Sequence, residues 1–511
     1  MLAASRITEL EQENTRLDRE LQSLTQQLDW FKRQLFGAKS EKQLEIDPSI
    51  QNSLFASLGV EAPPPKPDTE TVTYQRRKKC RDGAMNDSGL RFDDSVPRKV
   101  IRVTDPEFEA LLESERDIIG EKVSYRLAQR SASYVILEYH RLVYKRLTDN
   151  KVMTTPAPDN VLEKSSVDVS LLVGLLIDKF CYHLPLYRQH QRIQQAGIQL
   201  SRSSLTHWVS RAIDLLIPIV ESQYQHLLQS QVLAMDETPI KAGRQSKGKM
   251  RQAYLWPMFG DNDEIVFRYA PSRGHQNVQN WLKGFSGTLL SDGYEAYAAY
   301  ARQNDQVTHA QCWSHCRRYF ERSGQSDPSS DEALTLIGAM YRHEQIIRDK
   351  ALSGEVKLAY RTRHCEPIVQ AFWQWCDQQC HRLDLHPKDP LSKALNYAKA
   401  RRISLQVFLS NPNVPIDTNH LERSLRPIPM GRKNWLFCWT EMGAERVGII
   451  QSLLVTCKLH NIDPYTYLVD VLQRISVHPA RQVNELTPRL WKTRFADKSM
   501  KSDLEHETHD H

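Results

Sequence analysis

A strict heptad pattern opens the chain. Its apolar positions recur at alternating spacings of three and four residues over four heptads, as in the seam of a coiled coil. The seam residues are Leu10, Asn14, Leu17, Leu21, Leu24, Leu28, Phe31 and Leu35. Asn14 occupies an a position, where a buried amide fixes the register and favours two strands. We therefore expect residues 1–37 to form a parallel homodimer or a higher oligomer; the alternative is an amphipathic helix that docks on the rest of the chain.

The length of the chain predicts several domains. Its 511 residues exceed what one hydrophobic core can use, and the 40% apolar content is that of a folded protein. The longest apolar runs are far shorter than the ~20 residues of a membrane span, so no membrane association is expected. Nine cysteines scattered along the chain, with no signal peptide at its start, predict reduced thiols and a cytoplasmic location.

Residues 38–98 are predicted to form a linker with a basic cluster. Four prolines between positions 63 and 67 make this connector stiff and without periodicity. The cluster that follows consists of Arg76, Arg77, Lys78, Lys79 and Arg81. Such a cluster can neutralise several DNA phosphates, although most charge runs are merely solvated surface.

A small β-rich region is predicted over residues 99–158. Val123 to Leu127 alternates between apolar and polar residues, as a half-buried strand does. The segments 134–137 and 142–144 are rich in β-branched and aromatic residues, which favours two further strands. The first of these segments could also be a short buried helix.

Residues 159–228 are predicted to be helical and to include a helix-turn-helix-like pair. Helical spacing from Leu186 to Gln195 is interrupted by Gly197, and a second helix restarts behind a serine cap at Ser201. The second helix offers Arg202, Ser204 and His207 as DNA-reading side chains, while Leu205, Trp208 and Val209 can be buried. Helix pairs joined at a glycine also occur without any DNA function.

Two apolar runs end abruptly in aspartate. The run 232–235 leads into Asp236, and the run 287–290 leads into Asp292, with two expected strands (252–258 and 264–269) and a helical stretch (275–285) between them. Strands that end in acids can bring both carboxylates to one edge of a sheet, although acids also end strands as turn residues. Glu237 should point to the opposite face of its strand from Asp236.

A third acid is predicted on a short helix. Asp417 can cap this helix and Pro427 can stop it, which leaves Glu422 on a well-defined element. Taken alone, Glu422 fits a surface salt bridge with Arg426. Three carboxylates from two strands and a helix instead suit a pair of hard divalent cations, Mg²⁺ or Mn²⁺, and such a pair can activate a hydroxyl for attack on a phosphodiester.

Several short motifs resemble the IS66 family of insertion-sequence transposases. In chain order they are Phe31-Lys32-Arg33-Gln34-Leu35-Phe36-Gly37, His183-Leu184-Pro185-Leu186-Tyr187-Arg188, Met235-Asp236-Glu237-Thr238-Pro239, Ser291-Asp292-Gly293-Tyr294, Cys312-Trp313-Ser314-His315-Cys316-Arg317-Arg318, Asn419-His420-Leu421-Glu422-Arg423-Ser424-Leu425-Arg426-Pro427 and Gly431-Arg432-Lys433-Asn434-Trp435-Leu436-Phe437. The resemblance implies a multidomain α+β protein, a DDE transposase whose ribonuclease-H-like α/β core uses Asp236, Asp292 and Glu422 as its acidic triad.

The resemblance also implies how the remaining chain is divided. The core would occupy residues 229–325 and 405–450, separated by a helical insertion at 326–404. A C-terminal helical region (451–495) and a disordered tail (496–511) would follow. The implied partners are DNA, as element ends and as target, and small accessory proteins of the same element; the implied location is the bacterial cytosol at the nucleoid. Arg432, Lys433 and Trp435 would contact DNA near the catalytic site.

One departure from the family concerns zinc. The family usually carries paired Cys-x-x-Cys motifs ahead of the helix-turn-helix, yet no cysteine occurs between Arg81 and Phe180. Zinc is therefore not expected, and residues 99–158 should keep their fold by packing. Cys312 with His315 and Cys316, or Cys376 with Cys380 and His381, are alternative ligand sets, for which buried free thiols are the simpler interpretation.

Three functions fit these features. The first is an enzyme that cleaves at element ends and transfers strands into target DNA. The second is a catalytically inactive protein that binds DNA ends through its coiled coil and helix-turn-helix. The third is a metal-dependent nuclease without strand transfer, which would not need the coiled coil or the end-binding modules. Acids at all three expected positions favour the first.

Overall fold

The structure is a computed structural model that describes residues 90–505 apart from 93, 95, 104, 131–132 and 164. The chain divides into two units, Met1–Cys80 and Arg81–His511, and the description below concerns the second. The predicted coiled coil (1–37) and the basic cluster Arg76, Arg77, Lys78, Lys79 and Arg81 lie outside the described residues and stay predictions. The described part is a mixed α/β structure with several sheets.

The central sheet has the strand order β10-β9-β7-β11-β12. Its strands are β7 (Val232–Met235), β9 (Lys249–Phe259), β10 (Ile265–Ala270), β11 (Gly287–Ser291) and β12 (Val307–Gln311). β7, β11 and β12 are parallel, whereas β9 and β10 run antiparallel to their neighbours. A further strand, β8 (Thr238–Ser246), pairs with β9 to form a hairpin. The strands expected around residues 232–235, 252–258, 264–269 and 287–290 are confirmed.

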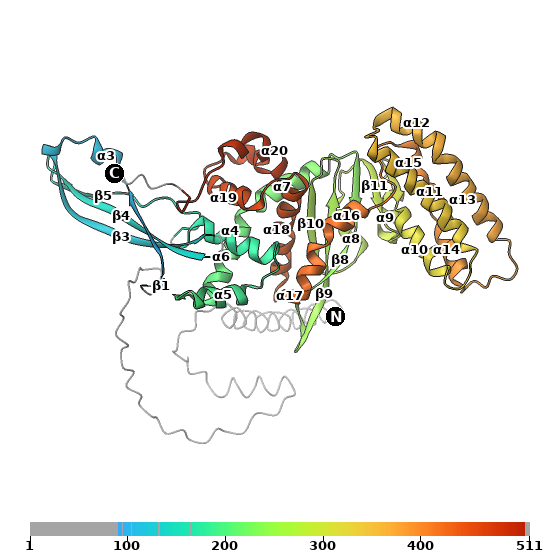
Figure 1. Cartoon of the computed structure of the whole chain (residues 1–511), viewed down its shortest axis with the longest axis horizontal. Helices are drawn as coiled ribbons and strands as arrows, with labels where there is room; N and C mark the ends of the chain where they lie inside the picture. The colour runs from blue at the N-terminus through green and yellow to red at the C-terminus, as the bar shows by residue number, and fades with distance from the viewer. Residues whose placement is uncertain are drawn as a thin grey trace, which may run out of the picture. The chain divides into compact units, whose positions relative to one another are not determined.

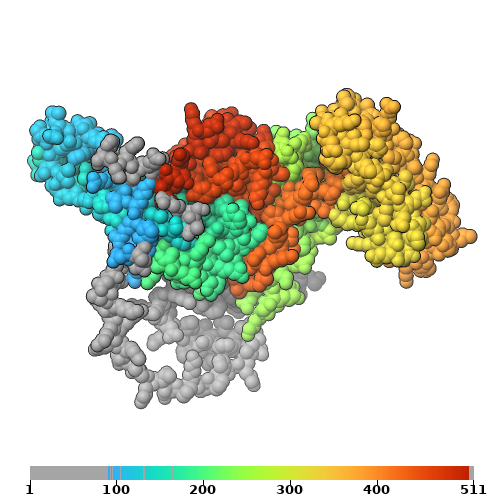
Figure 2. Space-filling view, viewed as in Figure 1, coloured from blue at the N-terminus to red at the C-terminus, as the bar shows by residue number. Residues whose placement is uncertain are grey.

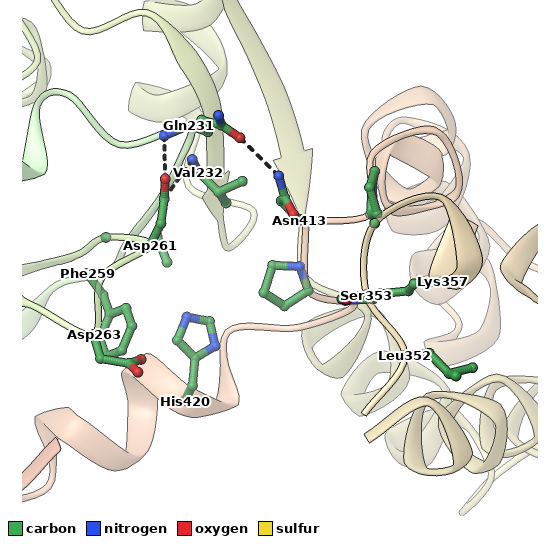
Figure 3. Close-up of a pocket in the computed structure, with 15 residues that line it drawn as sticks. Gln231, Val232, Phe259, Asp261, Asp263, Leu352, Ser353, Lys357, Asn413 and His420 are labelled. Carbon is green, nitrogen blue, oxygen red and sulfur yellow. Dashed lines mark hydrogen bonds between the residues drawn. The ribbon is translucent and has the colours of Figure 1, made fainter. Parts of the chain in front are cut away.

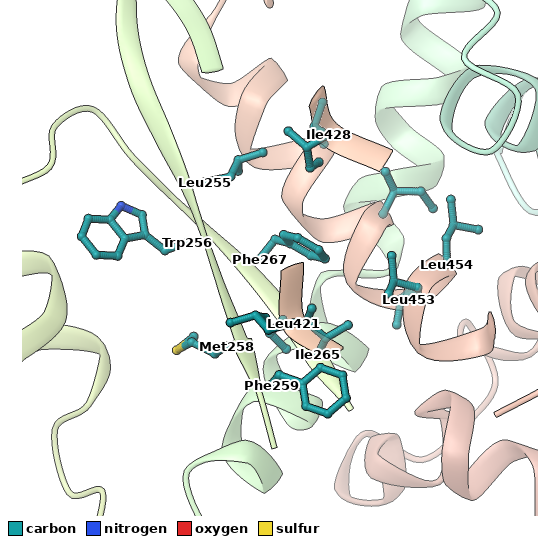
Figure 4. Packing of buried hydrophobic residues seen from close by; sticks show 14 of the residues in the cluster. Leu255, Trp256, Met258, Phe259, Ile265, Phe267, Leu421, Ile428, Leu453 and Leu454 are labelled. Carbon is teal, nitrogen blue, oxygen red and sulfur yellow. The ribbon is translucent and has the colours of Figure 1, made fainter. Parts of the chain in front are cut away.

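Helices cover both faces of this sheet (Figure 1). Phe267 of β10 packs against Leu453 and Leu454 of α18 (Glu441–Leu459), while Trp256 lies on the other side of β9 (Figure 4). The Trp256 ring meets Trp281 of α8 (His275–Trp281) and Tyr297 of α9 (Glu295–Arg302) edge-on. The central strands are therefore buried on both sides, which explains their continuous apolar runs.

The outer edge of β10 is closed by helix α18. Ser452 Oγ and Thr456 Oγ1 accept hydrogen bonds from the backbone N–H groups of Phe267 (2.9 Å) and Ile265 (3.2 Å). Gly448 allows this close approach, because a Cβ there would lie 2.6 Å from the carbonyl oxygen of Phe267. A helix that satisfies the free edge of a strand removes a site for unwanted pairing.

The region expected as a helical insertion is a helical bundle. After β12 come α10 (Trp313–Ser323), α11 (Ser330–Asp349), α12 (Gly354–His364), α13 (Glu366–Gln379), α14 (Pro390–Lys399) and α15 (Arg402–Ser410). Arg361 is fully buried, pairs with Glu344, and donates to the carbonyl oxygens of Phe408, Asn411 and Val414. The bundle thereby fixes the connection that returns to the core at α16 (Asn419–Leu425) and α17 (Pro427–Trp435).

The β-rich region forms a four-stranded sheet from β2 (Arg98–Val103), β3 (Arg116–Arg130), β4 (Ser133–Arg146) and β5 (Lys151–Thr154). Two short helices, α3 (Pro106–Glu109) and η1 (Glu113–Glu115), connect β2 to β3. Segments 134–137 and 142–144 were expected to be separate strands, but both belong to β4. The polar residues between them do not end the strand, because Tyr139 is buried and the alternation continues.

The helical region before the core contains α4 (Val169–Phe180), α5 (Leu186–Gln195), α6 (Arg202–Leu215) and α7 (Ile217–Leu227). The predicted helix pair is confirmed, as are the Ser201 cap and the burial of Leu205, Trp208 and Val209. The connection over 196–201 is longer than a three- to four-residue turn. It includes β6 (Ile198–Gln199), which pairs with β1 (Arg91–Phe92).

The C-terminal region contains α19 (Pro464–Arg474), η2 (Ala480–Leu486), α20 (Pro488–Arg494) and η3 (Ala496–Lys498). Residues 496–511 were expected to be disordered, but 496–505 are placed, and Asp503 and Leu504 contact the β-rich sheet. Leu504 is buried against Leu137 and Tyr139, and the Tyr139 hydroxyl donates to Asp503 (2.6 Å). Within the described part of the chain, no helix is long and apolar enough to span a bilayer.

Candidate active site

The ends of two neighbouring parallel strands bring Asp236 and Asp292 together. In the register of β7 and β11, Leu290 lies beside Ala234. Continuing this register by two residues places Asp292 beside Asp236, just beyond the ends of both strands. The carboxyl ends of adjacent parallel strands share one edge of a sheet, which is where open α/β sheets commonly place their sites.

The Glu237 carboxylate lies close to those of the two aspartates. One carboxylate oxygen from each of Asp236, Glu237 and Asp292 lies within 4.8 Å of the others. Each aspartate also caps its own turn, since Asp236 Oδ1 accepts from the Glu237 N–H (2.7 Å) and Asp292 Oδ1 accepts from the Tyr294 N–H (2.8 Å). One oxygen of each aspartate remains for another ligand.

The expectation that Glu237 points away from Asp236 is wrong. Residue 237 lies in the turn between β7 and β8, where strict strand alternation does not apply. Its side chain is only 4% exposed, forms an ion pair with Arg273 and accepts a hydrogen bond from the Tyr297 hydroxyl (2.8 Å). Within the described part of the chain, Glu237 is thus the one acid of this trio that forms an ion pair.

The electrostatics of the cluster disfavour ionised carboxylates. Burial raises the pKa of Asp236 to about 7, and the negative charges of Glu237, Asp292 and Glu422 add to this effect. Burial and the charge of Asp292 also raise the pKa of Glu237, against the opposing effect of Tyr297 and Arg273. Carboxylates held this close without sufficient positive charge are strained as anions, and a bound cation would relieve that strain.

Glu422 is not part of this oxygen cluster, although its charge acts on Asp236, and it is paired with one cation of this chain, Arg318. Both of its oxygens accept from Arg318 Nη2 at 2.8 Å, and His315 Nε2 lies 3.8 Å away. His315 and Arg318 are presented by the first turns of α10, immediately after β12. Burial lowers the pKa of His315, with a further contribution from Arg318.

The local helix that carries Glu422 differs in detail from the prediction. Asp417 accepts hydrogen bonds from the backbone N–H (3.0 Å) and side chain (2.6 Å) of Asn419, one residue before the formal cap at Thr418. Pro427 does not simply stop the helix but begins α17. The predicted partner Arg426 is not used, since Glu422 pairs with Arg318 instead.

The proposed cysteine sets have other roles. The Cys312 thiol accepts hydrogen bonds from the backbone and hydroxyl of Thr418 (both 3.3 Å), which ties the start of α10 to the start of α16. Cys316 is fully buried, and His315 faces Glu422. In the second set, Cys376 is buried, Cys380 is exposed and His381 Nδ1 lies 2.7 Å from the carbonyl oxygen of Asp377.

A cavity of about 580 Å³ lies away from the acids (Figure 3). It is lined by Val232 at the start of β7, by Phe259, and by residues 352–354 at the start of α12. The acids lie beyond the opposite end of β7. His420 lines this cavity two residues before Glu422, so the two sites lie on either side of the same short helix.

The predicted DNA-contacting residues that lie in the described part of the chain occupy two places. Arg202 and His207 are exposed on α6, whereas the Ser204 hydroxyl lies 2.8 Å from Ser201 Oγ. On α17, Lys433 is exposed and Arg432 donates to the carbonyl oxygen of Pro239 in β8.

Trp435 is half-buried over Gly431, where its ring occupies the space a Cβ would need. Sequence reasoning missed five residues near the acids or the nearby surface: Glu237, Arg273, His315, Arg318 and Trp439. Three of them lie in motifs quoted above: Glu237 was expected to point away from the site, His315 was considered only as an alternative zinc ligand, and Arg318 was given no role.

Comparisons with known proteins give consistent results. The model of the Transposase IS66 family matches residues 164–446, the IS66 C-terminal element matches 452–489, and the Transposase C of IS166 homeodomain matches 23–101. The uncharacterized protein y4hP of Sinorhizobium fredii (strain NBRC 101917 / NGR234) is 30% identical over 397 residues, covering 73% of this chain and 71% of the relative. The uncharacterized protein y4jD of the same organism is 27% identical over 95% of this chain and 97% of its own length. With more than half of its length matched by one family, this chain belongs to the IS66 family of transposases.

Proposed function

We propose that this transposase uses DDE chemistry: metal-dependent cleavage at the ends of an insertion sequence, followed by strand transfer into target DNA. The observation that carries the proposal is the convergence of Asp236 and Asp292 at adjacent strand ends. Glu422 on α16 is near enough for its charge to raise the pKa of Asp236. We assign these three acids as the catalytic, metal-holding triad.

The strand order supports a ribonuclease-H-like core. Numbered in chain order without the β8 hairpin strand, the sheet reads 3-2-1-4-5. Strand 2 runs antiparallel to both of its neighbours, so strands 1, 3, 4 and 5 all run in the same direction. The first acid follows strand 1 and the second follows strand 4. The third acid lies on a helix that returns to the sheet after the helical bundle.

The donor set fits hard divalent cations such as Mg²⁺ or Mn²⁺. Asp236, Glu237 and Asp292 offer carboxylate oxygens within 4.8 Å of one another, which are the ligands these ions prefer. Burial chiefly raises the pKa of Asp236, the neighbouring acids raise it further, and a bound cation would favour its ionised form. In this structure the Arg318 guanidinium compensates the negative charge of Glu422. We propose that a metal ion would replace Arg318 as the partner of Glu422 when DNA is bound.

Each residue then has a role in phosphodiester chemistry. When bound, a pair of divalent ions supplies positive charge that activates the attacking oxygen and stabilises the leaving oxygen. Asp236 and Asp292 hold this charge at the sheet edge, while Arg273 and Tyr297 keep Glu237 fixed beside them. If Glu422 held a metal ion, Arg318 would be free to contact a DNA phosphate, because arginine suits that geometry.

The family implies DNA as the partner. We further propose that α6, with Arg202, Ser204 and His207, reads the element ends, and that the basic cluster at 76–81 binds DNA without sequence preference. Dimerisation through residues 1–37 would hold two ends in one complex. A protein without catalysis, or a nuclease that does not join strands, remains an alternative.

The products of one reaction separate these alternatives. The purified full-length protein would be incubated with Mg²⁺ or Mn²⁺, a labelled DNA that carries the element ends, and a supercoiled target plasmid. We expect cleaved ends with free 3′ hydroxyls and joined plasmid products. Cleavage without joined products would support the nuclease, and end binding without cleavage would support the inactive protein.

A further inference from the structure

A large aromatic side chain is exposed on a basic surface of the catalytic region. Trp439 is 72% exposed, in the segment between α17 and α18. Its ring meets that of Phe437 edge-on, with centroids 5.2 Å apart. Burying a tryptophan normally stabilises a fold, so a tryptophan left in solvent next to a second aromatic residue indicates a contact made with another molecule.

The backbone holds these two rings in place. Leu436 ends α17 with a φ of +61°, a conformation that a bulky residue adopts only when its surroundings impose it. The chain then runs beside β8 as a short parallel bridge: the Cys438 N–H donates to the Lys241 carbonyl oxygen (2.8 Å), and the Gly243 N–H donates to the Cys438 carbonyl oxygen (3.2 Å). The segment that carries the two rings is therefore hydrogen-bonded to β8 of the β8–β9 hairpin.

The bridge also fixes which way the rings face. Ala242 is paired with Cys438, and Ala242 is fully buried. Side chains alternate along an extended segment, so Phe437 and Trp439 point to the opposite face from Cys438, the face on which Lys241 is exposed.

The surrounding surface is positively charged. The hairpin carries exposed basic side chains and no acidic residue between positions 241 and 251: Lys241, Arg244, Lys247, Lys249 and Arg251. The segment 423–439 likewise contains basic residues and no acid, and Lys433 of α17 is exposed. The tip of the hairpin projects beside α17, in light green next to orange (Figure 2). Arg251 pairs with Glu441 at 2.8 Å, so part of this charge is already compensated.

We propose that Trp439 and Phe437 form a stacking site for unpaired bases of the DNA strand near the cleaved end. This inference rests on the proposed function for its location, because β8 begins directly after Glu237 of the acidic cluster. Gly243, beside the rings, lies six residue steps along the extended strand from Glu237, a span of about 20 Å. That span matches about six nucleotides at stacked spacing.

Unpaired DNA suits this surface better than intact duplex. A duplex hides the faces of its bases and offers phosphates, for which the lysines and arginines suffice. Exposed aromatic rings within a basic groove are the arrangement by which proteins bind single strands, since every base offers a face for stacking. The surface thus offers basic side chains to the phosphates and aromatic rings to the bases of a single strand.

Binding measurements without metal test the site independently of catalysis. The full-length protein in EDTA would be titrated with two mixed-sequence probes, a blunt duplex and the same duplex with a six-nucleotide 3′ overhang. We expect tighter binding of the overhang. Trp439→Ala should reduce overhang affinity about 5- to 10-fold and blunt affinity less than twofold, and Trp439→Phe should restore most of the loss.

Controls separate stacking from charge and from folding. Lys247→Glu should weaken both probes, whereas Leu383→Ala, which removes a fully exposed apolar side chain on the helical bundle, should change neither. An overhang that carries 2-aminopurine should be quenched by the wild type and not by Trp439→Ala. The inference would be overturned if the wild type bound both probes with equal affinity, or if Trp439→Ala lost affinity for both probes to the same extent. A protein that binds as expected but cleaves nothing would overturn the proposed function alone.

Discussion

Replacing Asp236 by Asn should stabilise the metal-free protein above neutral pH. Burial raises the pKa of Asp236 to about 7 from an ordinary value of 3.8. Below pH 3.8 the carboxyl is protonated in both the folded and the unfolded chain, so it costs nothing. Between pH 3.8 and 7 it ionises in the unfolded chain first, and the free energy of unfolding therefore falls as the pH rises. Above pH 7 the full cost is present.

The size of this effect follows from the two pKa values. Their difference corresponds to a cost of about 4 kcal/mol at pH 8. At pH 5.5 the cost is about 2 kcal/mol, so the stability difference should grow by about 2 kcal/mol between these two pH values. Asn can keep the hydrogen bond that Asp236 Oδ1 accepts from the Glu237 N–H, which isolates the charge as the variable.

Urea unfolding in EDTA at pH 5.5 and pH 8 measures this difference. Glu221→Gln is the matched control, since Glu221 is exposed on α7 and pairs with Arg268 away from the acids. Mg²⁺ should stabilise the wild type at pH 8 and have a smaller effect on Asp236→Asn, because a ligand stabilises only the state that binds it. The reasoning would be refuted if Asp236→Asn were less stable than the wild type at pH 8, or if the difference did not change with pH.

Three further predictions concern assembly, DNA binding and packing. Deleting residues 1–36 should abolish self-association while the remaining chain stays folded; light scattering that shows an unchanged oligomer would contradict the coiled coil. Neutralising Arg76, Arg77, Lys78 and Lys79 should weaken binding to all DNA and flatten its salt dependence, whereas Arg202→Ala or His207→Ala should mainly reduce the preference for element ends in competition assays; equal losses on every sequence would refute the role of α6. Gly448→Ala should destabilise the protein by about 1 to 3 kcal/mol, because its Cβ would meet the carbonyl oxygen of Phe267 at 2.6 Å; an unchanged urea midpoint would show that α18 can shift away.

The strands of the core and the convergence of two acids could be predicted from the sequence. An apolar run that ends in aspartate is a local pattern, and it located both Asp236 and Asp292 because parallel neighbours end at the same sheet edge. The environment of each acid could not be predicted in this way. Glu237 is held by Arg273 and Tyr297, which are 36 and 60 residues away in the chain.

Partners of charged and aromatic side chains likewise depend on tertiary packing. The spacing of Glu422 and Arg426 favours a helical salt bridge, yet Arg318 of α10 takes both oxygens of Glu422. Trp435 and Trp439 look equivalent in sequence, but Trp435 packs over Gly431 before the helix ends, and the turn at Leu436 sends Trp439 into solvent. In β4, polar residues between two apolar segments suggested a break, whereas pairing with β3 along its length keeps one strand.

The most direct test of the central claim is the rate of strand transfer by single and double variants of the three acids. Asp236→Asn, Asp292→Asn and Glu422→Gln each remove one charge with little change in shape, so end binding should persist while strand transfer falls by at least about 10² to 10³. Double variants should lose scarcely more than single ones, because residues that act as one unit are not additive. Glu221→Gln is the control variant and should retain full activity, because Glu221 is exposed on α7 and lies outside the acidic cluster. A Glu237 variant is not a suitable control, because Glu237 belongs to that cluster. Strand transfer near the wild-type rate by any one of the three single variants would contradict the assignment of Asp236, Asp292 and Glu422 as the catalytic triad.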